Sequence, residues 1–320
     1  MKPRNLILAA AALCLGNAFA QSYPTKPIRL VVPYAAGGAT DAYARVYAPK
    51  YAEAWGQPVV VENRPGAGGN VGAELVAKSA PDGYIWLLNT AGQAIAPALF
   101  RKLNYDAARD LVPAAQIAST CLILAVSADA HVSSVKELVA RAAAQAGKFN
   151  FGSTGVGSAP HLVGEMFKSS GAIDIVHVPY KGDVQLLPAL LSNEVQIAFL
   201  PSGSALPMMK ANKLRALAST GRLRSVSAPD LPTMAEAGMP GVEYNGWSAL
   251  FVASGTPGEI VARIGAEMTR FVRSPDMGKY FAAWGVEQPS IAPEALAASY
   301  KAEIEKYARV VREAHIPLVD

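Results

Sequence analysis

The sequence predicts an α/β protein of two domains, on the basis of three observations. Branched apolar runs of strand length alternate with stretches of helical spacing. About 300 residues remain after an N-terminal export signal, which exceeds the size at which one hydrophobic core usually keeps growing. The strands fall into two groups, and each group has a glycine turn between a strand and a helix. We expect a signal peptide at 1–20, a first domain of 21–123 plus 245–320, and a second of 124–244, with crossings near 120–127 and 241–248.

The N-terminus has the residue order of a secretory signal. Lys2 and Arg4 precede an apolar run at 6–15, and small residues at 18 and 20 suit cleavage after Ala20. Cys14 lacks the small residue directly before it that a lipoprotein site requires, so no lipid anchor is expected. No later apolar run approaches the roughly 18 residues of a membrane span. The sequence therefore predicts an exported, periplasmic protein without a transmembrane helix.

Charge and cysteine content exclude several classes of function. Without Lys2 and Arg4 the chain has 27 basic and 25 acidic residues, a balance that argues against nucleic acid as a partner. Cys121 is then the only cysteine, so no internal disulfide can form, and we expect it inside an apolar strand. The four histidines lack metal-ligand spacing. We expect a monomer with no metal and no cofactor.

The first group of elements begins with a strand at 28–32, followed by the first glycine turn, residues 33–41, and a helix at 42–55. A second strand at 58–62 leads to the second glycine turn, residues 63–70, and a helix at 71–79. Val71 stands where the dinucleotide fingerprint requires its third glycine, so a nucleotide site is not expected. The third strand, 84–88, is followed by Thr90 and Gln93 at the sheet end where ligands collect in open α/β sheets.

The second group repeats this pattern. Ser134 and Glu137 have the spacing of a capping box at the start of a helix reaching Gln145. The third glycine turn, residues 152–158, lies between a strand at 149–151 and a helix at 159–170. The remaining expected strands are 173–178, 195–200 and 214–219, with one or two over 111–126. An apolar segment follows at 249–253, and the remaining helices are 186–191, 206–211, 257–272 and 293–314.

The first and third glycine turns suggest two helix N-termini that face each other across a cleft. Backbone N–H groups in the first turn of a helix have no intrahelical partner and lie at the positive end of the helix dipole. Such a cleft suits a carboxylate, because it needs no metal and no cationic side chain. The alternative, ordinary strand-to-helix connections with Thr40 or Asp41 as N-cap, remains open.

Other side chains have two interpretations each. Ser153, Ser158, His161 and Asp41 are the residue types of a nucleophile, base and orienting acid, but no G-x-S-x-G elbow occurs. Lys181 is either a cation facing a ligand or a solvated turn residue. Tyr34 and Tyr180 either line the cleft or pack at a domain surface.

Seven segments, in order along the chain, carry a resemblance to a known family. They are 33–41 (PYAAGGATD), 61–70 (VENRPGAGGN), 81–84 (PDGY), 152–158 (GSTGVGS) with His161, 177–182 (HVPYKG), 214–218 (LRALA) and 231–238 (LPTMAEAG). The chain resembles the Bug-type periplasmic solute-binding proteins, the receptors of tripartite tricarboxylate transporters. The resemblance spans essentially the whole mature chain.

This resemblance implies a type II periplasmic-binding-protein fold, with two α/β domains that close about a hinge on a small organic carboxylate. It also implies a binding protein, not an enzyme, that delivers its solute to integral-membrane transporter subunits. The first and third glycine turns would supply donors to one carboxylate. The ligand-binding residues implied are Tyr34, Ala36, Gly37, Gly38, Thr40, Asp41, Thr90, Gln93, Ser153, Thr154, Gly155, Gly157, Ser158, His161, Tyr180, Lys181, Asp183, Pro201 and Ser202.

The chain departs from the family pattern after Gly182, where Asp183-Val184-Gln185 replaces small residues and proline, and at residues 192–196. If Asp183 faces the cleft, it would disfavour a second ligand carboxylate and favour a cation or donor, such as the amine of an amino acid. Di- or tricarboxylates, aromatic acids and amino acids all remain open as ligands. Two other functions also remain: a receptor that signals to a sensor-kinase ectodomain, and a secreted hydrolase using Ser158 or Ser153 with His161.

Overall fold

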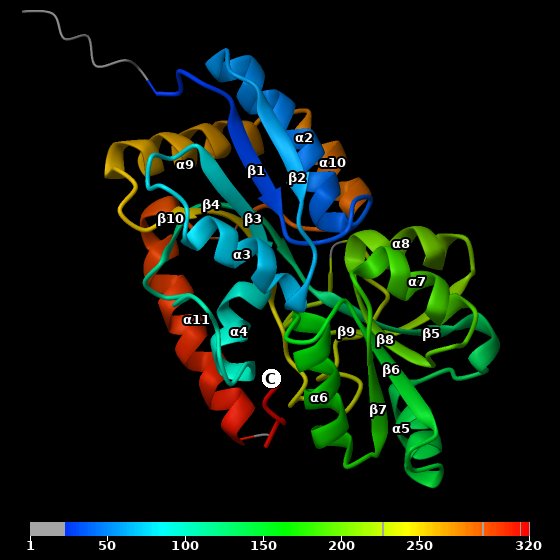
Figure 1. Cartoon of the computed structure of the whole chain (residues 1–320). Helices are drawn as coiled ribbons and strands as arrows, with labels where there is room; N and C mark the ends of the chain where they lie inside the picture. The colour runs from blue at the N-terminus through cyan, green and yellow to red at the C-terminus, as the bar shows by residue number, and fades with distance from the viewer. Residues whose placement is uncertain (1–22, 226, 290, 314, 320) are drawn as a thin grey trace, which may run out of the picture.

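The computed structural model describes residues 23–225, 227–289, 291–313 and 315–319, so the predicted signal peptide lies outside it. Within these residues, two five-stranded sheets form the centres of two lobes (Figure 1). The first sheet takes its strands from both ends of the chain, and the second from the middle. This two-lobed α/β architecture confirms the predicted fold class.

The first sheet has the strand order β2-β1-β3-β10-β4. Its strands are β1 (Ile28–Val32), β2 (Val59–Asn63), β3 (Ile85–Thr90), β4 (Leu111–Thr120) and β10 (Gly246–Ala253). Strand β1 is parallel to β2 and β3, whereas β10 is antiparallel to β3 and β4. Leu30 and Val32 pack into one hydrophobic core and Val31 into another. The strand buries both faces, as its continuous apolar run predicts.

The second sheet has the order β7-β6-β8-β5-β9. Its strands are β5 (Leu122–Ser127), β6 (Phe149–Ser153), β7 (Ile175–Pro179), β8 (Ile197–Pro201) and β9 (Leu214–Ser219). Strand β6 is parallel to β7 and β8, whereas β5 is antiparallel to β8 and β9. The two sheets thus have the same topology. The fourth strand in each order, β10 in the first sheet and β5 in the second, directly follows a crossing between the lobes and is antiparallel to both of its neighbours.

Both crossings are tied together by Thr220, which is fully buried. Its hydroxyl accepts a hydrogen bond from the Leu122 N–H at 2.9 Å and donates to the Tyr244 carbonyl at 2.9 Å. Its carbonyl accepts from the Tyr244 N–H at 2.8 Å. These bonds hold the outgoing and returning segments side by side, so the two segments form one hinge.

The expected place of Cys121 inside an apolar strand is wrong. Cys121 lies between β4 and β5, where the chain passes from one sheet to the other, and is partly exposed. The apolar strand begins one residue later, at Leu122. Residues 111–126 therefore contribute one strand to each lobe.

Helices cover both faces of each sheet (Figure 1). They are α2 (Ala39–Trp55), α3 (Asn70–Ala77), α4 (Gly92–Leu99), α5 (Val135–Ala144), α6 (Ala159–Gly171), α7 (Asp183–Leu191), α8 (Ser202–Lys210), α9 (Gly258–Val272), α10 (Met277–Trp284) and α11 (Pro293–Glu313), with 3₁₀ turns η2 (Ala67–Gly69) and η3 (Ala128–Ala130). None of the helices in the described part of the chain is long and apolar enough to cross a membrane.

Helices α4 and α10 are absent from the sequence prediction, and α7 and α8 begin three and four residues earlier than predicted. Helix α4 contains Gly92 and Pro97, which are poor helix formers, but buries Ile95 and Leu99 completely. Tertiary packing therefore overrides propensity there. The early start of α7 matters most, because it makes Asp183 the first residue of that helix.

Candidate functional site

A cavity of about 60 Å³ lies between the lobes, at the carboxyl ends of the central strands. The first lobe and the hinge contribute Tyr34, Gly38, Ala39, Thr40, Tyr43, Thr90, Thr120, Tyr244 and Ser248 to its wall. The second lobe contributes Leu122, Thr154, Ser158, Ala159, Pro160, Gly182, Asp183 and Pro201. The first residues of α2, α6 and α7 therefore line one cavity.

Helix α2 begins without a side-chain cap, because its N-cap residue is Gly38. Asp41 turns back on the preceding loop, and its carboxylate accepts from the Gly37 N–H at 2.8 Å, Arg45 Nε at 2.7 Å and Asn63 Nδ2 at 3.0 Å. Burial alone would raise the pKa of Asp41, but these hydrogen bonds lower it below its ordinary value. Asp41 thus stiffens the first glycine turn, and the first N–H groups of α2 stay open to the cleft.

One of those N–H groups is satisfied from the opposite lobe. The Asp183 carboxylate, on α7, accepts from the Ala39 N–H at 3.4 Å and from the Ser204 hydroxyl. Asp183 is only 8% exposed. A carboxylate of the second lobe therefore lies at the positive end of a helix of the first.

Helix α6 caps itself. Ser158 is its N-cap, and the Ser158 hydroxyl oxygen accepts from the His161 N–H at 3.4 Å and donates to the Gly155 carbonyl at 2.6 Å. Pro160 occupies the first turn, where it has no N–H to leave unsatisfied. Among the described residues, the N–H of Ala159 has no protein acceptor, and neither has that of Thr40 on α2.

The glycine turns of the two lobes are in contact. Gly68, in the second turn, has φ +63°, and a Cβ there would overlap the carbonyl oxygen of Val156 in the third turn. Gly157, with φ +80°, lies so close to the Phe100 ring that a Cβ would overlap it. The lobes are therefore closed on each other, and only glycine permits these approaches.

Two stacked histidines contact residues of the third glycine turn. The rings of His161 and His177 lie 4.0 Å apart at 17°. His161 Nδ1 accepts from the Gly157 N–H at 3.1 Å, and His177 Nε2 lies 2.7 Å from the Ser153 hydroxyl. Burial lowers the pKa of His161 to about 4 and of His177 to about 3, so both rings are neutral at neutral pH.

The serine and histidine pairing expected for a hydrolase is not formed among these residues. Ser153 is fully buried and contacts His177 rather than His161. Ser158 contacts the backbone N–H of His161, not its ring. Ser158 makes the contacts of a helix cap, and Ser153 bonds to Gly155 of its own turn as well as to His177.

The structure places eight of the sequence-derived site residues in the cavity wall: Tyr34, Gly38, Thr40, Thr90, Thr154, Ser158, Asp183 and Pro201. It places eleven outside the wall: Ala36, Gly37, Asp41, Gln93, Ser153, Gly155, Gly157, His161, Tyr180, Lys181 and Ser202. Of these, Gly155, Tyr180 and Lys181 line a neighbouring cavity of about 230 Å³ beside the second glycine turn. Gln93 is buried and bonded to Asn89 and Tyr105.

Sequence reasoning missed wall residues of two kinds. Tyr43, Ala159 and Pro160 lie on the first turn or two of α2 and α6, next to motif residues, so helical spacing alone could have found them. Tyr244 and Ser248 come from the returning hinge segment and β10, whose residues carry no motif.

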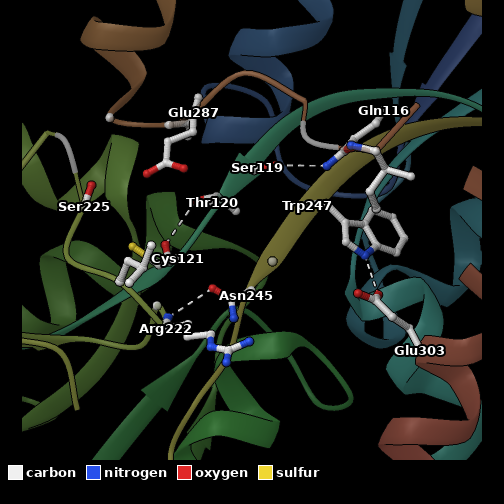
Figure 2. A pocket seen from close by; sticks show the side chains of 16 residues that line it. Gln116, Ser119, Thr120, Cys121, Arg222, Ser225, Asn245, Trp247, Glu287 and Glu303 are labelled. Carbon is white, nitrogen blue, oxygen red and sulfur yellow. Dashed lines mark hydrogen bonds between the residues drawn. The ribbon is translucent and has the colours of Figure 1, made fainter. Parts of the chain in front are cut away.

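A second, larger cavity of about 330 Å³ is lined by residues of the hinge (Figure 2). Thr120 borders both cavities, and Cys121, Asn245 and Glu287 surround the second one. Trp247 donates to the Glu303 carboxylate in its wall, and burial raises the pKa of Glu303. No residue of the glycine turns lines this hinge cavity.

Metal ligation has no basis in the described residues, which contain no group of three or more His, Cys, Asp or Glu side chains that could hold an ion. Among the described residues, Asp183 has the only charged side chain in the wall of the interdomain cavity. Any anion in this cavity would therefore be held by backbone and hydroxyl donors.

Comparison with known proteins identifies relatives along nearly the whole chain. A family model described as "Tripartite tricarboxylate transporter family receptor" matches residues 43–316. Protein BugT of Bordetella pertussis (strain Tohama I) is 33% identical over 309 residues, which cover 96% of this chain and 95% of BugT.

Solved structures match over a similar extent. The periplasmic binding protein BugD has a TM-score of 0.87 and 31% identity, covering 93% of this chain and 100% of BugD. A structure of R. palustris Rpa4515 with adipate has a TM-score of 0.88 and 33% identity, again covering 93% of this chain and 100% of the other.

Proposed function

Because this chain belongs to the receptor family of tripartite tricarboxylate transporters, whose members are periplasmic solute-binding proteins, we propose that its interdomain cavity captures a small organic carboxylate. The captured solute would be delivered to an integral-membrane transporter of the tripartite tricarboxylate type. The family description supports this handover.

The unpaired N–H groups of Thr40 and Ala159 carry the proposal. Each lies in the first turn of a helix, and both helices begin in the wall of the same cavity. A carboxylate offers about four lone-pair sites, so one group can accept from donors of both lobes at once. Closure of the cleft strengthens these bonds by excluding water.

The cavity wall also contains hydroxyl groups that can donate further hydrogen bonds to the ligand carboxylate. Tyr34, Thr90 and Thr154 line it, and the Tyr34 hydroxyl lies 3.1 Å from that of Thr90. Burial raises the pKa of Tyr34 to about 12, so it stays protonated and can donate. The adipate bound to Rpa4515, a structural relative at 33% identity, supports a carboxylate as the ligand class.

A thermal-shift screen of the chain from Gln21 onward tests the proposal. The panel contains dicarboxylates, tricarboxylates, aromatic acids and amino acids, with the amides of the same compounds as controls that lack the negative charge. A ligand at about 100 times its dissociation constant should add about 2.7 kcal/mol to the free energy of unfolding. Stabilisation by acids but not by their amides is expected. A panel without any stabilising acid would contradict the proposal, once mass spectrometry of the denatured protein has shown that no acid was co-purified.

Deletion of the gene tests the handover to a transporter. Uptake of the labelled acid should fall in the deletion strain and recover when the gene is restored. Normal uptake with lost induction of acid-responsive genes would instead indicate a receptor that signals to a sensor kinase.

A further inference from the structure

Asp183 is the one charged side chain in the described wall of the cleft, and it lies there as the first residue of α7. It is 8% exposed, and no described lysine, arginine or histidine lies within ion-pair distance of it. A buried carboxylate is costly unless it is compensated. Here the compensation within the described chain is limited to two donors, the Ala39 N–H and the Ser204 hydroxyl.

Those donors leave part of the carboxylate unused. Both contact Oδ2, whereas no hydrogen bond of the described residues reaches Oδ1. A carboxylate oxygen with free lone pairs in the wall of a cavity is a natural partner for a cation or a donor of a bound molecule.

We infer that Asp183 selects a ligand that carries a cationic amine together with its carboxylate, an inference that rests on the proposed function. The ligand carboxylate would bind toward α6, at the Ala159 N–H and the Thr154 hydroxyl, because Asp183 already occupies the Ala39 end of α2. The ammonium group would bind Asp183. A dicarboxylate would instead bring its second negative charge toward that of Asp183.

Steric crowding at α2 strengthens this division. A Cβ on Gly38 would lie 2.5 Å from Asp183 Oδ1, so the carboxylate is packed directly against the backbone at the start of α2. The negative charge of Asp183 therefore lies beside the start of α2, whereas the first turn of α6 contains no acidic residue.

Matched ligand pairs test the inference. In each pair an ammonium group replaces one carboxylate on a chain of the same carbon number: adipate with ε-aminocaproate, and succinate with γ-aminobutyrate. Calorimetric titration of the wild-type protein should give about tenfold or tighter binding of the amine-bearing member. Asp183→Asn, which keeps the shape and removes the charge, should reduce that ratio by about tenfold or more.

Two further variants make the result specific. Asp183→Ser serves if the amide variant misfolds, since it also removes the charge. Asp174→Asn removes an exposed carboxylate of the same lobe and should leave the ratio unchanged. The inference is overturned if the dicarboxylate binds the wild-type protein at least as tightly, or if Asp183→Asn leaves the ratio unchanged, and the proposed function then still stands. Absence of binding by every member of both pairs would also overturn the inference, whereas the proposed function falls only if no acid of the thermal-shift panel binds.

Discussion

The helices α2 and α6 begin in the wall of the same cavity, but their N-termini are capped in different ways. Helix α6 is capped by its own Ser158, whatever the other lobe does. Helix α2 has glycine at the N-cap, and the Ala39 N–H is met by Asp183 from across the cleft. The N-cap of α6 therefore lies within its own lobe, whereas the Ala39 N–H of α2 finds its acceptor only when the lobes meet.

Because of this difference, closure of the lobes changes the charge next to the start of α2. In an open cleft, α2 would expose an uncapped positive end to the solvent side of the cavity. Closure brings to it the carboxylate of Asp183 and, on our proposal, a bound acid. The self-capped α6 then acts as the fixed half of the site, and α2 as the half that depends on the domain arrangement.

We expect the largest effect on the contrast between α2 and α6 from a variant that prevents the lobes from meeting. In Gly68→Ala the new methyl group would overlap the Val156 carbonyl, so the second and third glycine turns could not approach. We expect the affinity for the acid found in the screen to fall by about a thousandfold or more, which corresponds to about 4 kcal/mol. Calorimetric titration measures this loss.

Gly56→Ala is the matched control for this variant. Gly56 has φ +67°, close to the +63° of Gly68, but no atom lies within 4 Å of where its Cβ would be. Both variants should lose similar stability through backbone strain, and only Gly68→Ala should lose affinity. Equal affinity in the two variants would show that binding does not require the observed closure.

Acidification should remove the stabilising contributions of His161, near α6, and of Asp41, near α2, in different pH ranges. The pKa of His161 is lowered from 6.5 to about 4, so the unfolded chain takes up a proton that the folded chain refuses as the pH falls from about 6.5 to 4. The free energy of unfolding should therefore decrease over this range, by about 3 kcal/mol for His161 alone. The pKa of Asp41 is lowered, so its contribution near α2 is lost only at still lower pH, below about 4.

Chemical denaturation at a series of pH values measures these contributions. His161→Gln should flatten the decrease between pH 6.5 and 4, whereas His131→Gln, at an exposed position, should retain it. If the His161 and His131 variants have the same slope, the stacked histidines do not stabilise the third glycine turn in their neutral form.

Removal of the N-cap of α6 should have the smallest effect on stability, but it should distinguish this helix clearly from α5 in acid binding. Ser158→Ala should cost about 1 kcal/mol of stability, as should Ser134→Ala, which removes the N-cap of α5 outside the cavity wall. Only the Ser158 variant should also weaken acid binding, because the turn before Ala159 loosens. Unchanged binding in Ser158→Ala would place the ligand carboxylate away from α6.

The helix starts could be predicted from the sequence because glycine turns between strands and helices have a local signature. Five of the eight candidate residues that line the cavity belong to the first and third glycine turns, Ser158 and Thr40 among them. Asp183 stands out in the sequence as a departure from the family pattern, but the sequence does not predict that it is the first residue of α7.

What the sequence did not reveal depends on long-range packing. Helix α4 contradicts its own propensities and exists because Ile95 and Leu99 are buried. The sequence pattern places Cys121 in a strand because apolar residues do not mark the position at which a chain changes sheets. Tyr244 reaches the cavity through its bonds to Thr220, a contact between segments that are remote in sequence from the glycine turns.

A crystal structure of the protein with the tightest acid from the screen tests the central claim most directly. We predict that the ligand carboxylate lies between the starts of α2 and α6, within about 3.2 Å of the backbone nitrogen of Ala159. Ligand density confined to the hinge cavity around Cys121 and Glu287, with the interdomain cavity holding only solvent, would contradict the account.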